Sequence, residues 1–131
     1  MSPSQTSIAA SSTPAIDLAS LLGRCLGNFK MVERVLTAFR NAGSSDLSQL
    51  QSAIEDENFS EIAEIAHRFK GSASNVSATV LQETLAQIEH LGREQKSDEL
   101  PALIERLKAE WSSFESYAQV FAPSESESTR V

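Results

Sequence analysis

Residues 60–75 read SEIAEIAHRFKGSASN. The apolar side chains recur at spacings of three and four, which at about 100° per residue places them on one side of a helix. His67 lies roughly 140° from the centre of this apolar stripe, Gly71 roughly 180°, Ser74 roughly 120° and Lys70 roughly 80°. The stretch therefore predicts a helix that buries one face and exposes these four residues on the other.

Gly71 is unusual inside such a helix, because glycine there costs about 1 kcal/mol relative to alanine. Its missing side chain, one turn after His67, leaves room for another protein to come close to the imidazole. Lys70 stands where its charge can neutralise an anion held at the ring. An exposed nucleophile, a cation and cleared space are what phosphoryl transfer onto histidine requires.

The same helical spacing continues on both sides of this stretch, and no period-2 alternation competes with it. We expect an all-α fold, an antiparallel four-helix bundle with one or two short additional N-terminal helices. Cys25 and Trp111 are predicted to lie in its core. The further helices are expected after Asp17 to about Gly27, from Asn28 with Gly43 just past the end, after Ser45 to about Ile54, from Ala78 to Gln95, and from Asp98 to Phe121.

Both ends of the chain differ from this pattern, because they are polar and rich in serine. Residues 1–14 and 122–131 are predicted to be disordered tails, the second of them acidic. A single bundle domain is expected over residues 15–121, which suits a chain of 131 residues.

Composition excludes several classes of function. The net charge of −7 would repel nucleic acid backbones and anionic lipids, so we expect neither nucleic acid nor membrane binding. A single cysteine cannot form an internal disulfide, and no cysteine pair offers a zinc site. The chain begins with no signal peptide pattern, and no apolar run approaches the roughly 18 residues of a membrane span. We expect a cytoplasmic protein.

The segment HRFKGS (residues 67–72), followed by Ala78, resembles the motif of the histidine-containing phosphotransfer (HPt) domain family. The segment IEHLGR (residues 88–93) resembles the stretch that faces the phosphorylated histidine in these domains. The resemblance covers roughly residues 16–121. It departs from the family pattern at Ser77, where a glycine is usual, and at Ala73, where a second serine is common.

The resemblance implies that His67 is the phosphoacceptor and that Lys70 stabilises the phosphate. It also implies a docking surface for the partner that includes Gly71, to which we assign Ser74, Arg68 and Glu89 as well. Glu89 occupies a position where some family members carry a glutamine that orients the imidazole.

The partners that the resemblance implies are receiver domains of response regulators or hybrid histidine kinases, in a two-component phosphorelay. The sequence has no Gly-rich nucleotide loop, so we expect no kinase activity of its own. We expect no cofactor and no metal on this chain, with Mg²⁺ on the receiver, and a monomeric state.

Two other interpretations of the sequence compete with phosphotransfer. Glu64-Ile-Ala-His67 matches the Glu-x-x-His pattern of di-iron bundles, but such sites need a second copy, and the counterpart before His90 has Gln87. Glu64 and His67 also point outward on the wheel, so the metal-enzyme interpretation fails. A helical adaptor that is never phosphorylated remains the alternative. His90 itself is predicted to be a surface residue.

Overall fold

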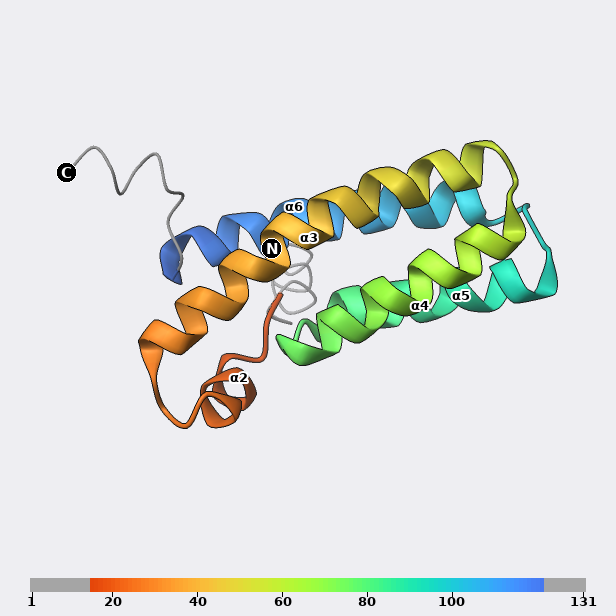
Figure 1. Ribbon diagram of the computed structural model, residues 1–131. Helices are drawn as coiled ribbons and strands as arrows, with labels where there is room; N and C mark the ends of the chain where they lie inside the picture. Colours follow the sequence, from red (N-terminus) through yellow and green to blue (C-terminus); the bar gives the residue numbers. More distant parts are fainter. Residues whose placement is uncertain (1–14, 122–131) are drawn as a thin grey trace, which may run out of the picture.

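The computed structural model describes residues 15–121, and it is helical, without strands in that range (Figure 1). The predicted all-α class is therefore confirmed, whereas the two predicted tails lie outside the described residues. The helices are α2 (Leu18–Arg24), α3 (Phe29–Glu55), α4 (Phe59–Asn75), α5 (Thr79–Glu94) and α6 (Leu100–Phe121).

The four long helices form an antiparallel bundle in which each packs against its neighbours in the chain, and α6 returns to α3 (Figure 1). The short helix α2 packs beneath the N-terminal part of α3, close to the end of α4. None of the helices within residues 15–121 is both long and apolar enough to cross a membrane.

Helix α3 runs without interruption through the point where the sequence predicted a break. Two helices separated at Gly43 and Ser45 were expected, and this expectation is wrong, because residues 29–55 form one helix. Gly43 is buried within it, and a Cβ atom built there would lie 2.3 Å from Cη2 of Trp111 in α6. This glycine marks the close approach of two helices and not the end of one.

Aromatic side chains fill the centre of the bundle, and Trp111 and Cys25 are buried as predicted. The rings of Phe39 and Trp111 lie 5.4 Å apart between centroids, and those of Phe69 and Trp111 lie 5.7 Å apart. Phe69 is fully buried two residues after His67. It therefore anchors the inner face of α4, which holds the opposite face toward solvent.

Both ends of α4 are set by local hydrogen bonding. At its start, Oδ1 of Asn58 accepts a hydrogen bond from the backbone N–H of Glu61 at 3.2 Å. Just past its end, Ser77 has a φ of 58°, the left-handed conformation that glycine adopts most easily. The usual glycine of the family motif has a conformational reason at this position. The hydroxyl of Ser77 lies 3.2 Å from Oγ of Ser20, and the backbone carbonyl of Ser77 accepts a hydrogen bond from the N–H of Asp17. These two contacts connect the turn after α4 to the start of α2.

Candidate functional site

His67 stands near the middle of α4, and 65% of its side chain is exposed to solvent. The neighbours that share the inner face of the helix, Ile65 and Phe69, are buried. The predicted outward position of the imidazole is confirmed. Glu64 and His90 are exposed as well, as expected from the sequence.

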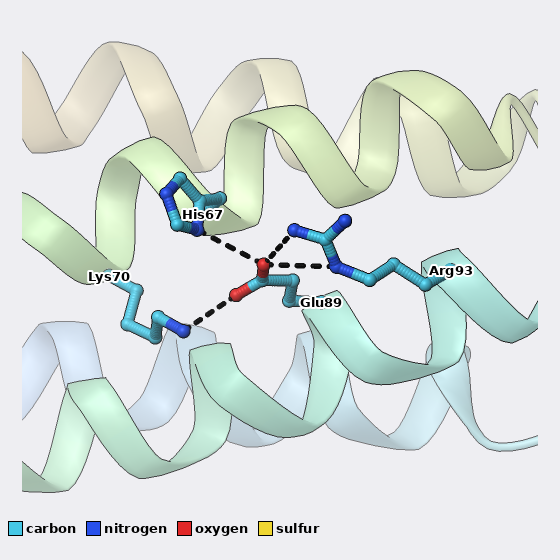
Figure 2. Close-up of polar contacts among 4 residues, drawn as sticks. All are labelled: His67, Lys70, Glu89 and Arg93. Atoms are coloured by element: carbon cyan, nitrogen blue, oxygen red, sulfur yellow. Dashed lines mark hydrogen bonds and ion pairs between the residues drawn. The ribbon is translucent and has the colours of Figure 1, made fainter.

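A buried carboxylate from the next helix lies directly beside the imidazole. Oε2 of Glu89, in α5, is 3.1 Å from Nδ1 of His67, and Oε1 is 2.7 Å from Nζ of Lys70 (Figure 2). The guanidinium of Arg93, one turn further along α5, places Nε 3.2 Å from Oε2 and brings Nη2 to the same oxygen. One carboxylate therefore holds the imidazole and two cations together, and the second ring nitrogen of His67 points away from it (Figure 2).

The close packing of α4 on α5 makes this network possible. A Cβ atom at Gly92 would lie 3.0 Å from the backbone nitrogen of Ala63, so the two helices could not approach this closely with a larger residue there. Because Glu89 lies one turn before Gly92, the close approach brings its short side chain within reach of the imidazole.

Burial opposes the charge on Glu89, and its partners favour it. Burial by itself raises the pKa of Glu89, but hydrogen bonds from Lys70, Arg93 and His67, together with the charge of Lys70, outweigh this effect and lower the pKa from 4.5 to about 2. The carboxylate is therefore ionised throughout the neutral range, and it can only accept from Nδ1. The unprotonated nitrogen of a neutral His67 is then Nε2.

This depressed pKa predicts a specific acid sensitivity. A carboxyl whose pKa is lower in the folded state stabilises the fold above pH 4.5, and the contribution is lost as the pH falls toward about 2. The loss is up to about 3 kcal/mol, reduced by solvent around the exposed Arg93. Unfolding free energies measured by denaturant titration from pH 6 to pH 2 should fall less steeply in Glu89→Gln than in the wild type. Glu64 is an exposed carboxyl on α4, so the unfolding free energy of Glu64→Gln should change with pH as that of the wild type does. Parallel curves for all three proteins would contradict the prediction.

The remaining predicted docking residues do not all join the network. Gly71 is exposed, and a Cβ atom there would meet nothing within 4 Å, so the space beside His67 is open. Ser74 lies one turn further along α4 and is half-buried. Arg68 turns toward α3, where Nη2 lies 2.7 Å from Oδ1 of the buried Asp46. The pair ties α4 to α3 on the flank of the predicted docking surface.

A cleft of about 730 Å³ opens beside His67, between the first half of α4 and the end of α5. Phe59 and Ala63 give it an apolar side, and Glu64 and Arg93 give it charge. Arg93 was not among the residues predicted for the site. Its signal in the sequence is the spacing of four residues from Glu89, which places two opposite charges on one helix face.

Comparisons with known proteins agree with this geometry. The family model of the Hpt domain matches residues 34–117, which is more than half of the chain and includes His67, Lys70 and Glu89. The crystal structure of histidine-containing phosphotransfer protein B (HptB) from Pseudomonas aeruginosa PAO1 superimposes with a TM-score of 0.73 at 25% sequence identity, covering 82% of this chain and 97% of that one. No curated protein sequence matches significantly. On the strength of the family match, the structural likeness and the bundle itself, the chain belongs to the Hpt domain family.

Proposed function

We propose that this chain is a phosphorelay intermediate that carries a phosphoryl group on Nε2 of His67. It would receive the group from the aspartyl phosphate of one receiver domain and return it, or pass it to another receiver, in two-component signalling. The observation that carries the proposal is the exposed imidazole whose Nδ1 is engaged by the buried Glu89. This arrangement leaves Nε2 as the ring atom available for attack.

The residues around the ring suit an incoming phosphoryl group. Lys70 and Arg93 place two positive charges beside the imidazole, and both can donate hydrogen bonds to phosphoryl oxygens. The chain contributes the nucleophile and these cations, whereas we assign the Mg²⁺ to the acidic pocket of the receiver. ATP-dependent phosphorylation is assigned to a separate kinase, and the chain itself is proposed to act as a monomer in the cytoplasm.

Gly71 offers a test of where the receiver docks. Gly71→Gln should stabilise the free protein by about 1 kcal/mol, because Gly71 is exposed within a helix and glutamine has the higher helix propensity. It should also slow transfer from a receiver by about tenfold, equivalent to about 1.4 kcal/mol, by filling the space beside His67. Gly71→Ala is the matched control, since it raises helix propensity with much less bulk and should transfer faster than the Gln variant. Thermal melts and transfer rates measure the two effects, and unchanged transfer in Gly71→Gln would place the receiver elsewhere.

The proposal as a whole is tested by incubating the chain with a receiver that carries a labelled phosphoryl group. Label should move to the chain, and the product should be labile in acid and stable in alkali, as a phosphoramidate is and a phosphoserine is not. The alternative function, a helical adaptor that is never phosphorylated, would be favoured if the chain bound receivers and none of them labelled it.

A further inference from the structure

Glu89 places a negative charge against Nδ1 of His67, the ring nitrogen that carries the proton. Its pKa of about 2 means that it stays ionised at neutral pH. Oε2 faces Nδ1 of His67 at 3.1 Å, and Oε1 lies 2.7 Å from Nζ of Lys70. Arg93 contacts Oε2 as well. The cations that could bind a phosphoryl group on the ring are thus already engaged by an anion of the protein.

Phosphorylation changes the charge of the imidazole. The lone pair of Nε2 forms the N–P bond, the P–O bond to the aspartyl carboxylate breaks, and the carboxylate leaves with the bonding electrons. No proton is lost in this step, so the ring keeps its hydrogen on Nδ1 and becomes positively charged. In the onward step the N–P bonding electrons return to Nε2, and a neutral imidazole leaves. A ring that had lost its Nδ1 proton would have to leave as an anion, which is a far poorer leaving group.

Resting on the proposed function, we infer that Glu89 is a positioning residue that keeps the phosphorylated ring of His67 protonated on Nδ1 and competes with the phosphoryl group for Lys70 and Arg93. The first effect keeps the imidazole ready to leave, and the second withholds cations from the bound phosphoryl group. Both act in the same direction. Both effects favour transfer of the phosphoryl group to a receiver and shorten the lifetime of phosphohistidine.

Within residues 15–121, no other charged group near the ring duplicates the role of Glu89. Helix α4 packs chiefly against α3 and α5. From α3, Asp46 is engaged by Arg68 on the flank of the site. From α5, Arg93 is a cation. On α4 itself, Lys70 is a cation, and Glu64 is an exposed carboxyl that lines the cleft.

Glu89→Gln separates charge from geometry, because a glutamine oxygen can still accept the hydrogen bond from Nδ1. The wild type and the variant would be phosphorylated with potassium phosphoramidate, which needs no partner protein, and the decay of phosphohistidine followed by ³¹P NMR at pH 7. The half-life should be several-fold longer in Glu89→Gln, up to about tenfold, since an opposite charge at this distance shifts a protonation equilibrium by about one pH unit. Glu64→Gln also removes one carboxylate charge, here from the cleft, and its phosphohistidine should decay at the wild-type rate.

A second measurement uses the ³¹P shift of the phosphorylated wild type as a function of pH, with free N-phosphohistidine alongside. The transition of the protein should lie at higher pH than that of the free compound, and at lower pH in Glu89→Gln than in the wild type. If His67 is phosphorylated but the phosphohistidine of Glu89→Gln decays no more slowly than that of the wild type, this inference is overturned and the proposed function stands. If His67 is not phosphorylated at all, both are overturned. If Glu89→Gln does not fold, the wild-type transition decides, and one at or below that of the free compound refutes the inference.

Discussion

His67→Gln is expected to abolish phosphoryl transfer to the chain, with no label above background after incubation with a phosphorylated receiver. The amide nitrogen of glutamine has no lone pair available for attack, so the N–P bond cannot form. The fold should be kept, because 65% of the His67 side chain is exposed and the amide N–H of glutamine can still donate to the carboxylate of Glu89. Gel autoradiography measures the label, and circular dichroism checks the fold.

His90→Gln is the matched control for this experiment. His90 is exposed on α5 and takes no part in the contacts of Glu89, so this variant should be labelled as the wild type is. Label that persists in His67→Gln would show that the phosphoacceptor is another residue. Loss of label in both variants would point to a general effect of the substitutions and not to the loss of one nucleophile.

The helix that carries His67 was predictable because its information is local. The apolar spacing of residues 60–75 depends on nothing beyond the segment, and the structure buries the predicted face and exposes the imidazole. Periodicity also predicted the all-α class. Such patterns work where one face of an element meets a single core, since burial then imposes the 3.6-residue period directly.

The break predicted at Gly43 failed because its true cause lies far away in the chain. Glycine is frequent just past helix ends, and locally this one fits that rule. The structure shows instead that Trp111 occupies the space of its missing side chain. No local rule can distinguish the two uses of glycine, because the second depends on which helix packs opposite.

The network around Glu89 was only partly predictable for the same reason. Family resemblance placed Glu89 near the imidazole, but the joining of Lys70 and Arg93 to its carboxylate depends on the distance between α4 and α5. Arg68 shows the converse. From the sequence we assigned it to the docking surface, and only the packing of α3 reveals Asp46 as its partner.

Gly43→Leu is expected to destabilise the protein by about 3 kcal/mol, at the upper end of what overpacking a core costs. A Cβ atom alone would lie 2.3 Å from Cη2 of Trp111, and the indole has little freedom to move. It is buried, with Phe39 5.4 Å and Phe69 5.7 Å away between ring centroids. The helices α3 and α6 must therefore separate or the aromatic cluster must repack. Urea denaturation followed by circular dichroism measures the change in free energy.

Gly71→Leu is the matched control, because it makes the same substitution inside a helix where nothing lies within 4 Å of the new Cβ. It should stabilise the protein by somewhat less than about 1 kcal/mol, the difference in helix propensity. Changes in unfolding free energy of opposite sign for Gly43→Leu and Gly71→Leu would distinguish a steric role of Gly43 from a general preference for glycine. In a Trp111→Ala background the space opposite Gly43 is vacated, so Gly43→Leu should cost clearly less there than in the wild type. An equal cost in both backgrounds would contradict the contact between Gly43 and Trp111 as the reason for this glycine.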